Sequence, residues 1–207
     1  GINGILYASS SSVYGDSTPT PYKESSQTLR PKSIYGVTKL SNEIFAEIHS
    51  KSSGLSFRGL RYFTVYGPWG RPDMAYFRIA AAALGQGKFT LFGDGSIRRD
   101  FTYIDNVIQA NVLSMITENE EAINTVYNVA FGERNTLNDL IDCLKESLTP
   151  YDPKIKDIQI KYGPNRAGDI PHSLASIDKA KNLLNYNPQY SLKQGLQEAV
   201  KWYWNNL

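Results

Sequence analysis

The sequence is poor in cysteine, histidine and methionine. Its 207 residues include one cysteine, Cys143, with two histidines and two methionines. A single cysteine excludes an internal disulfide framework and favours a reducing compartment, so we expect a cytoplasmic protein. No group of Cys, His, Asp and Glu has the spacing of metal ligands, so we expect no metal.

Long apolar runs and a strong charge of one sign are also missing. The 22 basic and 20 acidic residues leave a net charge of +2, which excludes a global field that would attract nucleic acid. No apolar run approaches the ~20 residues of a membrane span. No basic segment followed by an apolar one has the form of a signal peptide. We therefore expect neither nucleic acid nor a membrane as a partner.

What is present is an alternation of short apolar runs with helical patterns. The runs predict strands at 4–9, 55–63, 89–92, 99–104, 125–130 and 155–162. The helical patterns predict helices at 33–54, 75–87, 105–118, 136–148, 176–184 and 191–206. This alternation favours an α/β fold with a largely parallel sheet, which binds ligands beyond the carboxyl ends of its strands.

Polar side chains mark several of the predicted helix starts. Ser33 and Asp105 are suited to cap the helices that follow them. Two further helices begin with the spacing of a capping box, in the pairs Thr136–Asp139 and Ser191–Gln194. The helix at 33–54 also carries an apolar stripe, formed by Ile34, Val37, Ile44, Phe45 and Ile48.

Three residues form the strongest candidate for chemistry. Tyr35 and Lys39 stand four apart on the long predicted helix and so share a face. An ammonium group near a phenol favours the phenolate, which suits general acid/base work. Ser10 lies at the end of a predicted strand, where its hydroxyl can bond a reacting oxygen that Tyr35 also touches. The alternatives are a Tyr–Lys contact on a solvated helix face and a serine that satisfies backbone groups.

Six ordered blocks carry a family resemblance over essentially the whole chain. They read "YASSSSVYGD", "PKSIYGVTKLSNE", "LRYFTVYGPWGRPDMAYFR", "FGDGSIRRDFTYIDNV", "YNVA" and "PNRAGDIPHS". Together they resemble the extended short-chain dehydrogenase/reductases of the NAD-dependent epimerase/dehydratase family. Within that family the nucleotide-sugar epimerases are most similar, in particular those that act on UDP-glucuronate.

The resemblance implies a fold in two parts. We expect a partial doubly wound Rossmann-type sheet with an interleaved, smaller α/β domain that holds the nucleotide sugar. Residues 1–66 and 103–132 would belong to the NAD-binding domain, and residues 67–102 and 133–207 to the UDP-sugar domain.

The resemblance also implies an NAD-dependent 4-epimerisation through a 4-keto sugar. Ser10, Tyr35 and Lys39 match the catalytic residues. Tyr35 would take the proton of the sugar 4-hydroxyl, Ser10 would hold the sugar oxygen, and Lys39 would reach the nicotinamide ribose. Ala8 and Tyr62, together with Tyr35 and Lys39, would contact the NAD cofactor.

The positions after Ser10 narrow the reaction. Related dehydratases and decarboxylases have carboxylates there, whereas this chain has Ser11 and Ser12, of which Ser12 is assigned to the substrate site. A hydroxyl is a poor substitute for a carboxylate in proton transfer, which favours epimerisation without elimination or decarboxylation.

A threonine and an arginine favour UDP-glucuronate as the substrate. Thr64 stands where galactose epimerases usually have asparagine. Arg71 follows in the next loop, and a guanidinium can bind the sugar carboxylate at two points. UDP-glucose/UDP-galactose 4-epimerisation stays open as an alternative reaction. For the loop itself, the alternative is that residues 67–70 form only a rigid turn and that Arg71 is a surface cation.

The resemblance assigns further residues to the nucleotide. Arg99 aligns with the arginine on the pyrophosphate, and Arg166 and Asp169 with the pair that closes over the nucleotide. Thr90–Phe92 would lie near the uracil, and "FGDGS" before Arg98 is interpreted as a turn. We assign no role to Ser9, Arg78 or His172.

One family feature is missing. No G-x-x-G-x-x-G turn occurs in the 207 residues, and that turn belongs to the first half of a doubly wound domain. We therefore expect that the sequence is partial and that it binds NAD poorly. A remnant that binds a UDP-sugar without turnover is an alternative function. The strand at 4–9 would have an open edge. A homodimer through the long helix is a further implication of the resemblance, with Phe45 and Ile48 as candidate contacts.

Overall fold

The computed structural model describes residues 2–85, 90–164 and 172–207. Its main sheet has three parallel strands in the order β1-β2-β7, namely β1 (Gly4–Ser10), β2 (Ser56–Tyr62) and β7 (Thr125–Val129). The register places Ser10 beside Tyr62 and Tyr62 beside Val129, so the three carboxyl ends meet at one edge. The predicted α/β fold with parallel strands is confirmed.

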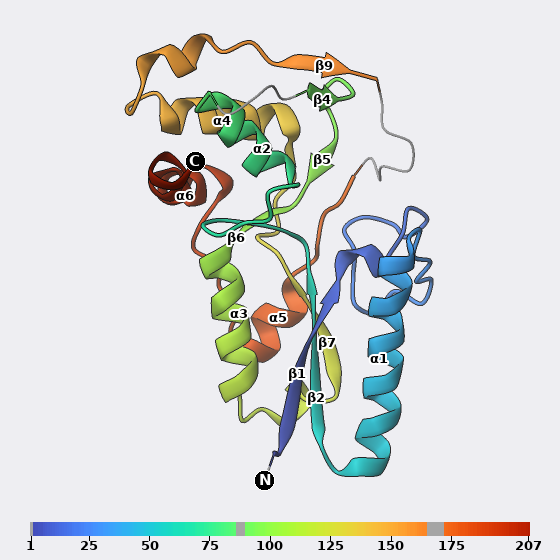
Figure 1. Cartoon of the computed structure of the whole chain (residues 1–207). Coiled ribbons are helices and arrows are strands. Elements are labelled where there is room, and N and C mark those ends of the chain that lie inside the picture. The colour runs from blue at the N-terminus through green and yellow to red at the C-terminus, as the bar shows by residue number, and fades with distance from the viewer. Residues whose placement is uncertain (1, 86–89, 165–171) are drawn as a thin grey trace.

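Helices cover both faces of this sheet (Figure 1). One face is covered by α1 (Ile34–Ser53), and the other by α3 (Ile104–Ile116) and α5 (Asp178–Leu184). A buried apolar cluster fills these layers and includes Leu60, Val107, Tyr127 and Leu184. Within the described residues, β1 pairs with β2 alone, so its other edge is open.

The second part of the molecule lies beyond the carboxyl edge of the sheet (Figure 1). It contains three two-stranded pairs: β3 (Thr64–Tyr66) with β6 (Phe101–Tyr103), β4 (Thr90–Phe92) with β9 (Lys161–Gly163), and β5 (Arg98–Arg99) with β8 (Asn135–Thr136). The first two pairs are parallel and the third is antiparallel. Its helices are α2 (Ala75–Ala83), α4 (Leu137–Leu148) and α6 (Leu192–Asn206).

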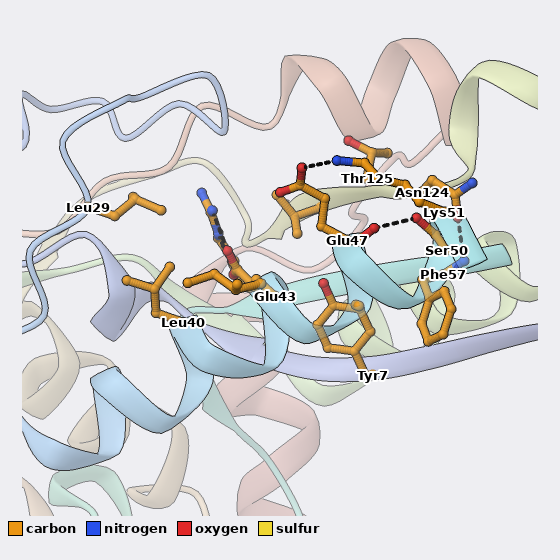
Figure 2. A pocket seen from close by; sticks show the side chains of 14 residues that line it. Tyr7, Leu29, Leu40, Glu43, Glu47, Ser50, Lys51, Phe57, Asn124 and Thr125 are labelled. Atoms are coloured by element: carbon orange, nitrogen blue, oxygen red, sulfur yellow. Dashed lines mark hydrogen bonds and ion pairs between the residues drawn. The ribbon is translucent and has the colours of Figure 1, made fainter. Parts of the chain in front are cut away.

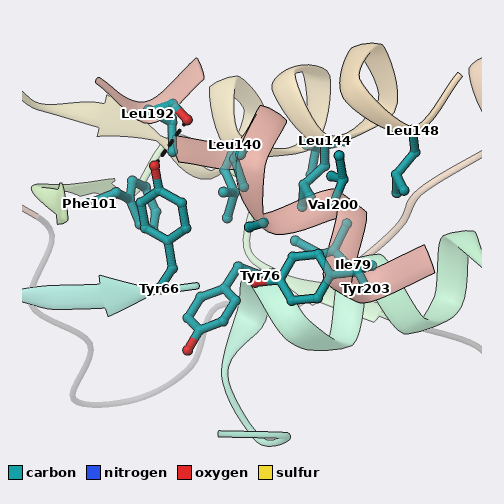
Figure 3. Packing of buried hydrophobic residues seen from close by; sticks show 14 of the residues in the cluster. Tyr66, Tyr76, Ile79, Phe101, Leu140, Leu144, Leu148, Leu192, Val200 and Tyr203 are labelled. Atoms are coloured by element: carbon teal, nitrogen blue, oxygen red, sulfur yellow. Dashed lines mark hydrogen bonds between the residues drawn. The ribbon is translucent and has the colours of Figure 1, made fainter. Parts of the chain in front are cut away.

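A second apolar cluster holds these helices together (Figure 3). Leu140, Leu144 and Leu148 line one side of α4 at helical spacing and face Leu196 and Val200 of α6. Tyr66 packs into the same cluster, and its hydroxyl donates to the Leu192 carbonyl over 3.0 Å. The division into two domains stays a prediction. The buried apolar residues within 175–186 pack in the cluster around the main sheet, whereas the prediction assigned this segment to the UDP-sugar domain.

Most predicted helix starts agree with the structure. Ser33 caps α1, and both capping boxes are present at α4 and α6. The prediction for Asp105 was wrong: Tyr103 occupies the cap position of α3, and Asp105 lies inside the first turn. A carboxylate there still interacts favourably with the helix dipole.

One other prediction needs correction. The alternating run at 155–162 is not one strand, because its first residues belong to the 3-10 helix Pro153–Asp157, which Asp152 caps. The apolar stripe of α1 faces outward: Ile34 is 85% exposed and Phe45 is 66% exposed. The buried residues of α1 are Gly36 and Ala46, and Glu43 bonds to Arg61 of β2. No helix in the described part of the chain is long and apolar enough to cross a membrane.

Candidate active site

Ser10 is the last residue of β1 and lies at the carboxyl edge of the sheet. Its side chain is buried, and its hydroxyl oxygen accepts a hydrogen bond from the Ser12 backbone N–H over 3.2 Å. This bond caps the short 3-10 helix Ser11–Val13 and fixes the direction of the Ser10 side chain. The hydroxyl hydrogen points to the Ser12 oxygen, also 3.2 Å away, so the two serines form one polar group.

The start of α1 approaches this serine turn closely. Ser33 accepts a hydrogen bond from the Gly36 N–H over 3.0 Å and so begins the helix. A β-carbon at Gly36 would lie 2.7 Å from the Ser12 carbonyl oxygen and 2.8 Å from Pro31 Cβ. Because glycine has no such atom, the helix turn that carries Tyr35 can pack directly against the Ser10–Ser12 turn.

Tyr35 and Lys39 point from α1 toward the same edge. The Lys39 Nζ lies 5.6 Å from the centre of the Tyr35 ring and donates to the Ala8 carbonyl over 3.1 Å. Tyr35 itself is 54% exposed, so its hydroxyl is open to a ligand. The structure therefore places Ala8, Ser10, Tyr35 and Lys39 around the end of β1.

A pocket of about 280 Å³ lies in the second part of the molecule. Its lining includes Thr64 at the start of β3 and Arg99 at the end of β5, both predicted for the substrate. Leu91 and Phe92 from the predicted uracil segment contribute apolar surface. Arg78, a residue with no predicted role, also lines the pocket. Ala75, three residues earlier on α2, lines the same pocket, so the two residues share a helix face. The spacing of three is visible in the sequence.

The loop between β3 and α2 carries Arg71. Its guanidinium forms an ion pair with Asp73, which lines the pocket, and that carboxylate is the main cause of the raised pKa of Arg71. The Tyr35 hydroxyl makes a smaller contribution to the same shift in pKa. Trp69 in this loop has a positive φ of 58° and is 84% exposed, a strained backbone of the kind found beside functional sites.

Other predicted residues lie apart or have their polar groups engaged. The Tyr62 hydroxyl donates to Asn111 on α3 over 2.8 Å, and burial raises the pKa of Tyr62. The "FGDGS" segment is a turn in which Asp94 accepts from the Ser96 N–H over 2.9 Å. Arg166 and Asp169 lie outside the described residues.

Two residues near the site, Ser9 and Glu43, were not predicted from the sequence to have a role. The Ser9 hydroxyl donates to the Glu43 carboxylate, which forms an ion pair with Arg61 beneath α1. Glu43 stands four residues after Lys39 and therefore shares its helix face, which the sequence does indicate. Its partner Arg61 was not predictable, because the contact depends on how α1 lies over β2.

Comparison with known proteins identifies relatives along the whole chain. Residues 1–130 match the NAD dependent epimerase/dehydratase family. UDP-glucuronate 4-epimerase 4 of Arabidopsis thaliana is 36% identical over 96% of the chain, which spans 47% of that relative. Protein CapI of Staphylococcus aureus is 33% identical over 98% of the chain, which spans 63% of it. The chain thus spans between about half and two thirds of the curated relatives it matches.

Solved structures agree with this result. UDP-glucuronic acid 4-epimerase from Bacillus cereus, solved with UDP-glucuronic acid and NAD, has a TM-score of 0.82 at 34% identity, over 97% of this chain and 61% of that one. UDP-glucose 4-epimerase from Thermotoga maritima, solved with UDP-glucose, has a TM-score of 0.88 at 31% identity, over 99% and 64%. The two similar proteins therefore bind different UDP-sugars.

Proposed function

Since the chain belongs to the NAD-dependent epimerase/dehydratase family, we propose that it takes part in 4-epimerisation of a UDP-sugar, converting UDP-glucuronate to UDP-galacturonate. The observation that carries the proposal is the grouping of Ser10, Tyr35 and Lys39 at the carboxyl edge of the sheet. Arg71 is paired with Asp73 of the pocket, and the pocket, which Thr64 and Arg99 also line, lies beyond this edge.

The proposed chemistry divides between Tyr35, Ser10 and Lys39. Tyr35 is exposed and so can take the proton of the sugar 4-hydroxyl and later return it. The Ser12 N–H fixes the position of the Ser10 oxygen, and the Ser10 hydroxyl would exchange its bond to the Ser12 oxygen for one to the same sugar oxygen. Lys39 lies over the Tyr35 ring, where its positive charge stabilises a developing phenolate.

The cofactor site is proposed at the same edge. Lys39 and Tyr35 would hold the nicotinamide end of NAD beside the Ala8 carbonyl and Tyr62, at the carboxyl ends of β1 and β2. When bound there, NAD would supply the reversible hydride transfer at C4 of the sugar that 4-epimerisation needs. The family's glycine-rich turn is not among these 207 residues, so we expect weak NAD binding by this chain alone.

The substrate assignment rests on Arg71 and the serines. The Arg71 guanidinium already forms a two-point contact with a carboxylate, that of Asp73, and the C6 acid of glucuronate offers the same group. Ser11 and Ser12 supply no carboxylate for elimination or decarboxylation. Arg71→Ala should weaken UDP-glucuronate binding far more than UDP binding; equal losses would contradict the assignment.

The nucleotide would occupy the second part of the molecule. Arg99 and Arg78 give the pocket two guanidinium groups suited to a diphosphate, and Phe92 offers an aromatic ring near the predicted uracil position. Arg166 and Asp169 are proposed to complete this site on the resemblance alone.

The deciding experiment incubates the chain and NAD with UDP-glucuronate or UDP-glucose in separate reactions. Formation of UDP-galacturonate from the first is the expected result, and NMR of the anomeric protons distinguishes the epimers. Product from UDP-glucose alone would replace the substrate assignment. Binding of both nucleotide sugars with no product would favour a UDP-sugar-binding protein without turnover. Absorbance and mass analysis for co-purified NAD test the cofactor separately.

We also propose that two copies associate through α1. Its outward face carries Phe45 and Ile48, which are 66% and 60% exposed. Exposed apolar side chains at helical spacing favour packing against another helix. Sedimentation of Phe45→Glu against the wild type tests this: a dimer that persists in the variant would contradict the proposal.

A further inference from the structure

A buried ion pair lies beneath the helix that carries Tyr35 and Lys39. The side chains of Glu43 on α1 and Arg61 on β2 are only 9% and 3% exposed. They meet at two points, Arg61 Nε to Glu43 Oε1 over 2.8 Å and Nη2 to Oε2 over 2.7 Å. Figure 2 shows Glu43 between Leu40 and Glu47, at the wall of a cleft between α1 and the sheet. This two-point geometry fixes both the distance and the rotation of α1 over β2.

The remaining N–H groups of Arg61 extend the contact to two other segments. Nη1 donates to the Tyr14 hydroxyl over 2.8 Å, and that hydroxyl donates to Asn128 Oδ1 over 2.7 Å. Asn128 lies on β7 and its amide donates to the Tyr22 carbonyl over 2.9 Å. The network therefore links α1 and β2 to the loop after Ser10 and to the third strand.

The network joins the catalytic group through neighbouring residues. Lys39 and Glu43 are one helix turn apart, and their partners Ala8 and Ser9 are consecutive on β1. The next residue of β1 is Ser10. Two adjacent contacts thus attach one face of α1 to the end of the strand that presents the catalytic serine.

We propose that Glu43 and Arg61 are positioning residues, which keep Lys39 and Tyr35 of α1 in register with Ser10 of β1. A buried ion pair is weak evidence of a contribution to stability, because a well-packed apolar pair often serves as well or better. An apolar pair, however, has no two-point geometry and would leave the helix free to rotate or slide by a fraction of a turn. The proposal rests on the proposed function for the roles of Tyr35, Lys39 and Ser10.

The first test measures the geometry without any turnover. Competitive acetylation of lysines, read by mass spectrometry, compares Lys39 in the wild type, Glu43→Gln and Arg61→Met. If the pair holds Lys39 against Ala8, both variants should label Lys39 at least threefold faster. A purely electrostatic effect would change the Lys39 labelling rate in opposite directions in the two variants. Glu43→Gln removes a negative charge near the amine, whereas Arg61→Met removes a positive charge.

Glu47→Gln is the matched control. Glu47 stands one turn further along α1 and pairs with Lys51 at 2.8 Å, with both side chains exposed. Its replacement should change the labelling of Lys51 and leave Lys39 as in the wild type. Unchanged Lys39 labelling in both Glu43→Gln and Arg61→Met would overturn the proposal.

A double variant covers the case in which a single change prevents folding. Glu43→Leu with Arg61→Met removes both charges, so no buried charge is left unpaired. We expect this variant to fold and to label Lys39 at least threefold faster. Where turnover is measurable, kcat should fall about tenfold while KM for the UDP-sugar stays within twofold, because the network does not contact the sugar pocket. A folded double variant with wild-type labelling would overturn the proposal, and absence of turnover in the wild type would contradict the proposed function alone.

Discussion

Arg71 and Asp73 form a two-point ion pair at the pocket, with Nε to Oδ1 at 3.1 Å and Nη2 to Oδ2 at 2.6 Å. Arg71 lowers the pKa of Asp73, so the acid stays ionised and competes for the guanidinium. A substrate carboxylate that binds Arg71 must displace Asp73 or share the arginine with it. Asp73 therefore affects the choice between acidic and neutral sugars under the proposed function.

Asp73→Asn should strengthen binding of UDP-glucuronate. The change removes a competing charge, and because both side chains are mostly exposed the gain is modest, about two- to fivefold in Kd. UDP-glucose has no carboxylate, so its affinity should stay unchanged. Titration calorimetry with both ligands measures the difference. An equal change for the two sugars would show that Asp73 does not act through Arg71.

Tyr35→Phe should abolish most turnover and leave the fold intact. Loss of a general acid/base lowers kcat by about 10²- to 10⁴-fold. The ring of Tyr35 is half exposed, so removal of its oxygen leaves core packing unchanged, and UDP-sugar affinity should stay within threefold. Tyr162→Phe, on β9 with its hydroxyl bonded to Asn138, is the matched control. Similar losses of turnover in both variants would contradict the assignment of Tyr35.

The sequence was sufficient for features that depend on local spacing. The capping boxes at Thr136 and Ser191 involve residues three apart, so the helix starts could be predicted without knowledge of the fold. The pair Tyr35–Lys39 is local in the same way. The strand predicted at 155–162 was wrong because the alternation is short and Pro153 begins a 3-10 helix. Asp152 caps this helix by accepting a hydrogen bond from the Lys154 N–H over 2.9 Å.

Features that depend on contacts between elements were not predictable. The apolar stripe of α1 could be predicted, but not which residues the helix buries, which are Gly36 and Ala46 beside the ion-paired Glu43. A carboxylate can take a core position only when a partner such as Arg61 meets it there. That meeting follows from the parallel register of β1 and β2, which hydrophobic periodicity does not contain.

Asp100 should make stability depend on pH. Burial raises the pKa of Asp100 to about 7, although the backbone N–H groups of Ala175, Gly132 and Phe131 oppose the shift. The folded chain therefore keeps a proton that the unfolded chain loses above pH ~4. The stability linked to this proton is complete below pH ~4 and is lost as pH rises toward 7, with a slope of up to about 1.4 kcal/mol per pH unit.

Urea unfolding of the wild type and Asp100→Asn at four pH values between 4.5 and 7.5 measures this slope. We expect the variant to be less stable, because its amide presents N–H groups to backbone donors, but its stability should depend less on pH. Asp94→Asn is the control, since hydrogen bonds from Ser96 lower the pKa of Asp94 and its titration lies below this range. Equal slopes for the wild type and Asp100→Asn would show that Asp100 does not titrate there.

Gly195→Ala should destabilise the protein, although alanine is the better helix former. Gly195 lies inside α6, where replacing glycine by alanine is worth about 1 kcal/mol in helix propensity. A β-carbon here, however, would lie 2.2 Å from the Tyr66 hydroxyl oxygen and 2.7 Å from Tyr103 Cβ. The Tyr66 hydroxyl is held by the Leu192 carbonyl at 3.0 Å, and the Tyr103 atom is next to the backbone, so neither can move away easily.

Overpacking of this kind costs about 1–3 kcal/mol, which exceeds the gain in propensity. We therefore expect a net loss of about 1 kcal/mol in the free energy of unfolding, measured with urea. Gln197→Ala, on the exposed side of the same helix, should stay within about 0.5 kcal/mol of the wild type. A Gly195→Ala variant more stable than the wild type would mean that α6 can shift away from Tyr66 and Tyr103, and that the close approach of this helix to β3 and β6 is not required by the packing.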